Sequence, residues 1–536
     1  MTDVDVLIAG AGPTGLVLAL WLARSGVRIR VVDKAATAGT TSRALVVHAR
    51  TLEFYRQLGI ADDVVEASTR FAAVNLWVHG RHAARVDIGA IGQGLTAYPY
   101  MLVFPQDEHE RLLLAHLADA GVDVERPCAL RDFDDRGTHV VAQLLHADGR
   151  EETCTAAFLA GCDGAHSTVR EQLRAGFPGA TYAHVFYVAD VEAGGPVMNH
   201  ELHVALDFAD LLAVFPMKGE GRARLIGTVI DDSERTLGKP NGAEKRLFDN
   251  KRRKVVSGPV VSAPLEWSDV HRGIIERLRM DVSQVNWFST YHVHHRVASR
   301  FRAGRAFLLG DAAHIHSPVG GQGMNTGIGD AVNLGWKLAG VLGRRLSEPA
   351  LDTYETERIA FARRLVATTD RAFQLASSDG PIARFVRIRA LPSVMPWLFT
   401  YRFVRRFLFR TVSQTAIDYR DSALARGAAR SVRAGDRLPW IELDGTPADN
   451  YASLASRDWQ VHVYGEADRH VVELCAQRRL ALHAFAWAPS MQRAGFARDA
   501  RYLLRPDGYV ALAQPRGEEL RALARYLDDW TIAART

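Results

Sequence analysis

The chain is predicted to be an α/β protein with several domains, and three features of its sequence support that fold class. A short apolar strand, a glycine-rich turn and an apolar helix follow one another within residues 4–25. Alternating apolar and polar residues, typical of antiparallel strands, dominate residues 180–295. Strand and helix patterns alternate again beyond Gly435. A chain of 536 residues is also too long for one core, because a domain takes roughly 150 residues.

The first strand is the β-branched, apolar run at residues 4–9, a pattern typical of a buried parallel strand. Apolar residues then recur at helical spacing over 16–25, and Gly26 is the expected C-cap residue of this helix. A second buried strand over 27–32 ends in Asp33. Together these segments predict a strand–turn–helix–strand unit.

The remaining elements are predicted from the same periodicities. Helices are expected over 51–58, 108–120 and 327–343, and arginine-rich helical segments extend to about residue 430. Strands are expected over 122–125, 158–162, 201–207, 224–229, 306–309, 459–464 and 481–487, and the strand pattern recurs over 502–511 around a turn at 505–509.

Composition excludes several classes of protein. With 48% hydrophobic and 24% charged residues, the chain is neither disordered nor collagen-like, and a net charge of +5 gives no reason to expect nucleic-acid binding. Four cysteines form no C-x-x-C, so neither a zinc site nor a redox dithiol is expected, and a reducing cytoplasm fits. No secretory signal and no spanning apolar run is found, so we expect a cytoplasmic protein without a membrane span.

The glycine-rich turn contains Gly10, Gly12 and Gly15 in the pattern G-x-G-x-x-G, directly after a strand and at the start of a helix. The first glycine permits a tight turn, the second lets the backbone approach a pyrophosphate, and the third lets helix and strand pack closely. Asp33 follows where an acid would hold a ribose hydroxyl. The motif predicts a dinucleotide site, but by itself it leaves both NAD and FAD open.

Two distant segments favour FAD. One is GCDGAHSTVR at residues 161–170, and the other runs from GRAFLLGDAAH at 304–314 to SPVGGQGMN at 317–325. In this order and spacing, the three segments resemble the single-component FAD-dependent aromatic hydroxylases over roughly the first 370 residues. Within them, the chain is most similar to the branch of phenol hydroxylase, 3-hydroxyphenylpropionate hydroxylase and the aromatic polyketide hydroxylases. The resemblance implies a Rossmann-like domain that binds FAD non-covalently.

Roles for individual residues follow from this resemblance. It implies that Asp311 accepts hydrogen bonds from the ribityl chain and that Gln106 and Arg50 contact the flavin and its phosphates. Backbone donors at 323–325 would face the polar edge of the flavin ring, and Leu130 would make a main-chain contact to the adenine. Asp163 is implied to serve the domain architecture and nicotinamide access. The expected cofactor-binding residues are Gly10, Gly12, Pro13, Thr14, Gly15, Asp33, Lys34, Arg43, Arg50, Gln106, Leu130, Asp163, Asp311, Pro318, Gly321, Gly323, Met324 and Asn325.

The resemblance also implies the reaction. No second G-x-G-x-x-G follows a strand, and in the family NAD(P)H reduces the flavin without a Rossmann domain of its own. O2 then forms a flavin C4a-hydroperoxide, which hydroxylates a phenolic or polycyclic aromatic substrate. Tyr291, in WFSTYHVHHR, matches a substrate-facing tyrosine, and a phenol of pKa about 10 can share a proton with a substrate hydroxyl. A tyrosine packed in the core is the alternative.

The chain departs from phenol hydroxylase at Leu45, where that enzyme has an aspartate five positions before R-T-L-E. His48 is the candidate that would replace this base, and the alternatives are an ordinary histidine at a helix start or a substrate that brings its own acidity. A Baeyer–Villiger-type oxygenation and a non-catalytic flavin-binding protein also stay open. A halogenase is disfavoured because W-x-W-x-I-P is absent.

Several other patterns receive ordinary interpretations. Histidines at 292, 294, 295, 314 and 316 lack carboxylates at ligand spacing, so no metal is expected. The basic run at 251–254 is interpreted as a solvated loop. The segment 402–410 is interpreted as a helix packed on the flavin and substrate domains, with a membrane surface as the alternative. A homodimer is a further expectation.

The predicted division of the chain has five parts. Residues 1–180 and 296–375 form the FAD-binding domain, and residues 181–295 form an antiparallel sheet for the substrate. Residues 376–430 are a helical linker region. Residues 431–536 resemble a thioredoxin-like domain, and with Cys475 alone this domain cannot exchange dithiols.

Overall fold

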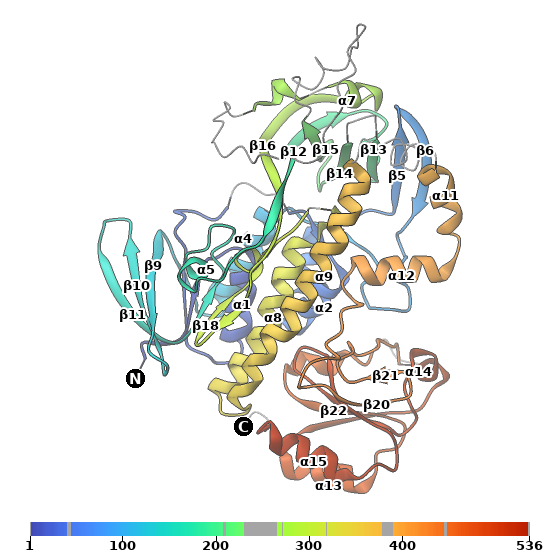
Figure 1. Cartoon of the computed structure of the whole chain (residues 1–536). Helices are drawn as coiled ribbons and strands as arrows, with labels where there is room; N and C mark the ends of the chain where they lie inside the picture. Colours follow the sequence, from blue (N-terminus) through green and yellow to red (C-terminus); the bar gives the residue numbers. More distant parts are fainter. Residues whose placement is uncertain are drawn as a thin grey trace, which may run out of the picture.

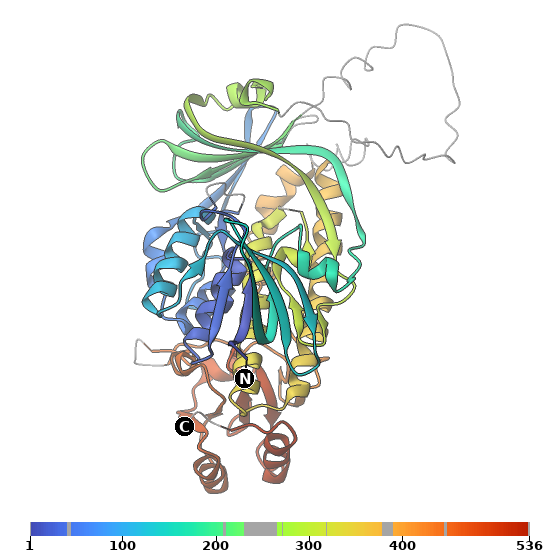
Figure 2. The same ribbon diagram turned by 90° about the vertical axis from the view of Figure 1, so that its left-hand side faces the viewer.

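The computed structural model describes residues 2–39, 44–206, 211–229, 265–270, 272–317, 319–377, 390–443 and 448–533. Three features from the sequence lie outside these residues: Arg43, Pro318 and the basic run at 251–254. Figures 1 and 2 show three layers of structure, with one sheet at the top, the dinucleotide-type sheet in the middle and the C-terminal unit below.

The middle sheet has the order β17-β18-β11-β1-β2-β8, and its strands from β18 to β8 are parallel. Val6, Leu7 and Ile8 of β1, which lies between β11 and β2, are fully buried, as is typical of an inner strand of a parallel sheet. The predicted α/β class is confirmed. The strands are β1 (Val4–Ala9), β2 (Ile29–Val32), β8 (Val124–Glu125), β11 (Glu151–Gly161), β17 (Arg302–Ala303) and β18 (Ala306–Leu308).

Two long helices pack against each other beside this sheet (Figure 1). Helix α1 (Pro13–Ala23) follows the glycine turn, and helix α8 (Gly323–Leu342) begins one turn earlier than predicted. Glycines at its start weaken the helix signal in the sequence, and packing overrides that weak propensity. The other elements of this part are α2 (Ala49–Gln57), α3 (Ala61–Ala67), α4 (Gln106–Asp119), α5 (Thr168–Gln172), β3 (Val46–Val47), β4 (Thr69–Arg70), β7 (Leu102–Val103), η2 (Gly310–Ala312), η3 (Val319–Gly321) and η4 (Glu348–Leu351).

An antiparallel extension of the middle sheet was not predicted. Strands β9 (Cys128–Asp135) and β10 (Val140–His146) form a hairpin that pairs with β11. The extension lengthens β11 toward its amino end, where residues 151–157 carry an alternating burial pattern.

The second sheet has the order β19-β16-β12-β15-β14-β13-β5-β6 and is antiparallel except between β13 and β5. Strands β5 and β6 come from the first 180 residues, so the sheet takes in more than the predicted segment 181–295. Helix α7 (Gly273–Arg277) covers one face through Ile274 and Ile275. The elements are β5 (Ala73–Val78), β6 (Arg81–Asp87), β12 (Gly179–Gly194), β13 (Leu202–Leu206), β14 (Leu211–Pro216), β15 (Arg222–Val229), β16 (Asp281–Val297), β19 (His314–Ile315) and η1 (Trp267–Asp269).

The C-terminal unit contains a third sheet with the order β21-β20-β25-β24-β22-β23. It begins at Arg426, a few residues before the predicted boundary, and the thioredoxin-like assignment stays a prediction. Its elements are β20 (Arg426–Ala429), β21 (Val432–Arg433), η6 (Ala452–Ser456), β22 (Gln460–Tyr464), α13 (Arg469–Arg478), β23 (Ala481–Phe485), α14 (Pro489–Ala494), β24 (Arg501–Leu504), β25 (Val510–Gln514) and α15 (Leu520–Asp529).

Three helices connect the layers. Helix α9 (Asp352–Ser377) runs beside α8, while α11 (Leu391–Leu398) packs against β6 and is followed by α12 (Arg402–Val412) (Figure 1). In the described part of 376–430, α11 and α12 are helical and residues 426–429 form β20, so the division into a helical linker region stays a prediction.

Candidate functional site

The glycine turn is shaped by two different constraints. Gly10 has φ +103°, and a Cβ there would overlap the Cys162 carbonyl, while a Cβ on Gly15 would overlap the Gly10 carbonyl. These two glycines are required by the packing of the protein itself. By contrast, a Cβ on Gly12 would meet no protein atom within 4 Å. The turn therefore leaves the side of Gly12 and the amino end of α1 open to a ligand, as an approaching pyrophosphate requires.

Asp33 is held in place at the end of β2. Its carboxylate accepts hydrogen bonds from the amides of Ala11 (2.7 Å) and Ala35 (2.8 Å) and pairs with Arg126 at 3.2 Å. Arg126 also donates to the Ala11 carbonyl at 3.3 Å. Lys34 beside it is exposed. Arg126 therefore links the glycine turn to Asp33, although it belongs to no motif that the sequence analysis identified.

Thr14 brings the glycine turn and the third motif together. A Cβ on Gly310 would lie 2.6 Å from Thr14 Oγ1, and a Cβ on Gly327 would overlap the same atom. The amino end of α1, the loop carrying Asp311 and the first turns of α8 therefore meet around one threonine side chain. Asp311 itself is exposed there. Pro13 is the first residue of α1, where its missing amide hydrogen costs nothing.

The side chain of Asn325 is fully used inside the protein. Its Nδ2 donates to the carbonyls of Val46 (2.8 Å) and Gly321 (2.9 Å), and its Oδ1 accepts from the His48 amide (2.9 Å) and Thr51 Oγ1 (2.8 Å). Asn325 thus fastens the segment 46–51 to the start of α8. Because the Asn325 side chain is occupied, only the backbone of residues 323–325 can make the expected contact with the flavin edge, and this contact stays a prediction. The Met324 side chain is half-buried.

His48 is buried at the N-cap of α2. Its Nε2 bonds the Gly320 carbonyl at 2.9 Å, which makes Nε2 the donor, and Nδ1 has no hydrogen-bond partner among the described residues. Burial lowers the pKa of His48 to about 4, so the imidazole is neutral at neutral pH. These features indicate that His48 positions the Gly320 loop and does not act as a general base.

Gln106 begins α4, Leu130 lies on β9, and Asp163 follows β11, where its backbone lies against Gly10. Gln106 accepts from the Ala44 amide at 3.3 Å, and Leu130 is buried in β9. Asp163 Oδ2 accepts from the Val169 amide at 3.1 Å, whereas Oδ1 is buried and has no hydrogen-bond partner in the part of the chain that the structure describes. Burial raises the pKa of Asp163, and its backbone lies against Gly10. This placement supports an architectural role for Asp163.

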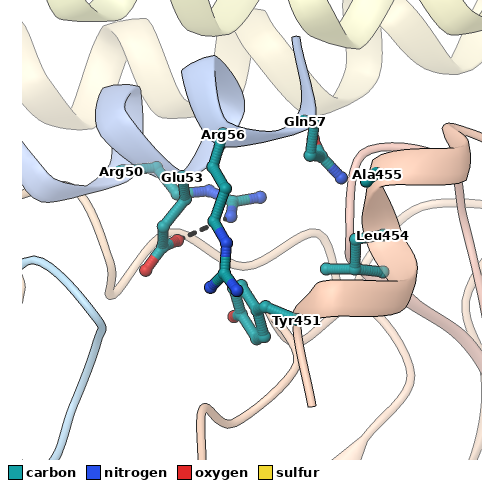
Figure 3. Close-up of a pocket in the computed structure, with 7 residues that line it drawn as sticks. All are labelled: Arg50, Glu53, Arg56, Gln57, Tyr451, Leu454 and Ala455. Atoms are coloured by element: carbon teal, nitrogen blue, oxygen red, sulfur yellow. Dashed lines mark hydrogen bonds and ion pairs between the residues drawn. The ribbon is translucent and has the colours of Figure 1, made fainter. Parts of the chain in front are cut away.

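Arg50 is placed differently from the phosphate contact expected of it. Its guanidinium pairs with Glu53 at 2.8 Å, donates to the Asp507 carbonyl at 2.8 Å and lies over the Phe54 and Tyr509 rings. These partners direct it toward the C-terminal unit. Figure 3 shows it in a pocket between α2 and η6, which is lined by Arg50, Glu53, Arg56, Gln57, Tyr451, Leu454 and Ala455.

The second sheet presents one face to the middle layer. Tyr291 pairs with Phe186 across β12 and β16, with ring centroids 6.0 Å apart, and it is half-buried. Because side chains alternate along strands, Tyr291 and Trp287 share the face opposite α7. Tyr291 therefore lies on the side of the sheet that faces the glycine turn's domain.

A buried ion pair on this face was missed by the sequence reading. Arg224 of β15 is fully buried and forms two bonds to Asp190 of β12, at 2.5 Å and 2.6 Å. It also donates to the Ala44 carbonyl at 3.4 Å and lies 5.8 Å from the Trp287 ring. The pair joins the second sheet to the strand that leads to His48. Neither residue belongs to a motif, so only the pairing of β12 with β15 reveals it.

The loop of Asp311 rests on a buried carboxylate. Asp330 in α8 accepts from the Gly310 amide (3.0 Å), His314 Nε2 (2.7 Å) and Arg358 Nε (2.6 Å). His314 is thereby a structural partner of Asp330. Within the described ranges, no group of three His, Cys, Asp or Glu side chains could hold a metal ion.

The residues present fit a bound flavin dinucleotide. The open side of Gly12, the amino ends of α1 and α8 around Thr14, and the acids Asp33 and Asp311 lie in one region. Helix amino ends favour a pyrophosphate and the electron-rich edge of a flavin ring, and the acids suit sugar hydroxyls.

Comparisons with known proteins agree with this geometry. Residues 3–369 match the family described as FAD binding domain. The chain is 34% identical to 6-methylpretetramide 4-monooxygenase of Streptomyces rimosus, over 97% of this chain and 92% of that one. It is 31% identical to 12-dehydrotetracycline 5-monooxygenase/anhydrotetracycline 6-monooxygenase of the same species, over 94% of each. The solved structure of CabE, an aromatic hydroxylase from angucycline biosynthesis, superposes with a TM-score of 0.74 at 28% identity, covering all of both chains.

Proposed function

This chain belongs to the FAD-binding family of aromatic monooxygenases, and we propose that it hydroxylates a polycyclic phenol of the aromatic polyketide class. The relatives named for 6-methylpretetramide and anhydrotetracycline, and the hydroxylase from angucycline biosynthesis, support this class. NAD(P)H and O2 are the co-substrates of the reaction.

FAD, when bound, supplies the redox ring that accepts hydride from NAD(P)H and activates O2. The residues of this chain hold and orient it. The amino end of α1 and the open side of Gly12 support binding of the pyrophosphate, and Asp33 and Asp311 support binding of the sugar and ribityl hydroxyls. The amino end of α8 would favour the polar edge of the ring, where negative charge develops on reduction.

The substrate would bind between this site and the inward face of the second sheet. Trp287 and Tyr291 offer aromatic surface there, and the Tyr291 hydroxyl can share a proton with a substrate hydroxyl without carrying charge. Asp190 is paired with Arg224, and Leu45 stands where phenol hydroxylase has a carboxylate. We therefore propose that the substrate ring is activated by proton sharing with Tyr291 and by the acidity of the fused-ring phenol itself. A carboxylate base is not part of this proposal.

The observation that carries this proposal is the meeting of the glycine turn, the Asp311 loop and the start of α8 around Thr14. The test is a steady-state screen of the purified holoenzyme against monocyclic and polycyclic phenols. We expect polycyclic phenols to stimulate NAD(P)H oxidation and to yield about one hydroxylated product per nucleotide. Peroxide as the sole product for every aromatic would contradict it and would favour a flavin-containing binding protein. A lactone product would instead indicate Baeyer–Villiger chemistry.

A further inference from the structure

Helices α11 and α12 carry a set of large side chains that the rest of the protein does not cover. Phe403 is 70% exposed, Phe407 68% and Trp397 58%, and Val394 and Tyr401 are exposed beside them. Trp397 contacts Tyr401, with ring centroids 5.0 Å apart, and Tyr401 contacts Phe403 at 5.8 Å. We refer to Val394, Trp397, Tyr401, Phe403 and Phe407, with the exposed residues Arg402 and Arg406, as the α11–α12 surface.

The outward direction of these rings is fixed by residues that point inward. Phe403 and Phe407 are four residues apart and share one helix face. On the other side of α12, Phe409 is buried so closely against Gly92 that a Cβ there would overlap its ring. Phe399, between the two helices, packs into the cluster around Leu45 and Phe71. The helices are therefore anchored through one face, and their exposed aromatic face is a feature of the packed structure.

The charge of this region has one sign. The described residues 390–417 contain four arginines and no aspartate, glutamate or lysine. Arg402, Arg405 and Arg406 have no carboxylate within ion-pair distance in the described part of the chain. A large apolar patch of this kind needs a partner. A second copy docked through the same patch would bring arginines against arginines, because a two-fold interface is self-complementary. An anionic partner is favoured instead.

We propose that the α11–α12 surface binds the anionic face of a lipid bilayer. Exposed Trp, Tyr and Phe side chains beside Arg, on short amphipathic helices, form the composition of a segment that lies in the headgroup region. Phe403, Phe407 and Trp397 enter the acyl boundary, while Arg402 and Arg406 reach the lipid phosphates. Among the described residues, no helix is both long and apolar enough to span a bilayer, so the association is peripheral.

The α11–α12 surface adjoins the second sheet, which carries the proposed substrate-facing residues. Helix α11 packs against β6 at the edge of the second sheet, and Phe399 reaches the cluster that includes Val74, Val86 and Phe215 of that sheet. A bilayer at the α11–α12 surface therefore lies next to the β6 edge of the sheet that also carries Tyr291, on β16 toward its other edge. This arrangement suits a poorly water-soluble aromatic substrate that partitions into lipid.

The test is flotation of the holoenzyme with vesicles of phosphatidylcholine alone and of phosphatidylcholine mixed with phosphatidylglycerol. We expect the holoenzyme to float with the mixed vesicles at low salt and to be released at high salt. Phe403→Ser with Phe407→Ser should weaken this binding by tenfold or more, since two buried aromatic groups are lost, where about 1.4 kcal/mol is tenfold. Arg406→Glu should weaken it severalfold.

Val472→Ser provides the matched control, because Val472 is 46% exposed on α13 in the C-terminal unit. This variant should float like the unaltered protein. An unchanged ratio of flavin to protein establishes that each variant is folded. Failure of the holoenzyme to float with either vesicle overturns the proposal, as does equal flotation of the double phenylalanine variant. A lipid-free dimer that becomes a monomer in that variant also overturns it, because the surface is then a contact between copies.

Discussion

Arg505 of the C-terminal unit inserts its guanidinium between two buried carboxylates, those of Glu357 in α9 (2.8 Å) and Asp507 (2.6 Å). Glu357 also accepts from Lys337 of α8 at 2.9 Å and from Ser422 at 2.7 Å. The next residue, Arg358, holds Asp330, which supports the Gly310 amide in the Asp311 loop. The C-terminal unit is thus joined by a continuous buried network to the region proposed to hold the flavin.

Glu357→Gln should destabilise the protein strongly. The substitution leaves Lys337 buried without its carboxylate partner and Arg505 with Asp507 alone, and breaking a buried pair in this way costs about 3–5 kcal/mol. We expect a lower denaturation midpoint and a reduced flavin content, measured by chemical unfolding and by absorbance. Arg478→Ala breaks a partly exposed pair with Asp528 and should cost at most about 1 kcal/mol. Equal effects of the two substitutions would contradict the network.

The same carboxylate predicts how stability depends on pH. Arg505 and Lys337 overcome the burial of Glu357 and lower its pKa from 4.5 to about 2. Because the folded pKa lies below the unfolded one, this contribution is present above pH 4.5 and is lost as the pH falls toward 2. Glu357→Gln lacks the group, so its free energy of unfolding should fall less steeply in this window, by roughly 3 kcal/mol in total. Parallel acid-unfolding curves for the two proteins would argue against the assignment.

Gly12→Val should separate folding from cofactor binding. The protein has no atom within 4 Å of a Cβ at this position, so the fold should tolerate valine while the branched side chain blocks the pyrophosphate. We expect a normal circular dichroism spectrum, no bound flavin and no thermal stabilisation on adding FAD. Gly15→Val is the matched contrast, because its Cβ overlaps the Gly10 carbonyl and should prevent folding. If the Gly12→Val protein retains flavin, the glycine turn does not contact the pyrophosphate and the prediction is wrong.

The sequence predicted the parts of the fold that have local signals, and it missed those that depend on distant pairing. The run 4–9, the glycine turn and Asp33 carry their periodicity and spacing with them, and the structure brings them together as predicted. Strands β5 and β6 join a sheet formed mostly by residues beyond 180, and no local pattern reports such a partner. Arg224 and Asp190 were missed for the same reason.

The contact of Arg50 with the flavin phosphates, expected from its motif, stays a prediction, and its side-chain partners lie elsewhere. Its neighbours in sequence match the family pattern, but Glu53 and the Asp507 carbonyl hold its guanidinium at the C-terminal unit. In the opposite direction, the segment 402–410 was predicted to pack against the domains, and it does so only through one face. Which aromatic side chains of an amphipathic helix are covered depends on the tertiary structure around it.

The pH profile of kcat/KM for hydroxylation should show no pKa that belongs to His48 between about pH 5 and 8. An unperturbed histidine titrates in this range. Burial has already lowered the pKa of His48 to about 4, and Nε2 is bonded to Gly320. We expect the same profile of kcat/KM for His48→Gln as for the unaltered enzyme, at a lower flavin affinity, because the Gly320 loop loses its anchor. If the unaltered enzyme shows a pKa near 6.5 in this profile and the variant lacks it, His48 acts as the general base and the prediction is wrong.

Tyr291→Phe tests the substrate-facing hydroxyl. The substitution keeps the ring against Phe186 and removes only the group proposed to share a proton with the substrate, so hydroxylation should slow by about 10²–10⁴-fold, the range of one proton-transfer group. Flavin reduction by NAD(P)H should change little, because that step does not use the hydroxyl. Stopped-flow absorbance separates the two steps. Thr290→Val, on the same strand but facing α7, is the matched control and should leave both rates nearly unchanged. If Tyr291→Phe slows both steps equally, or neither, the tyrosine has a packing role only.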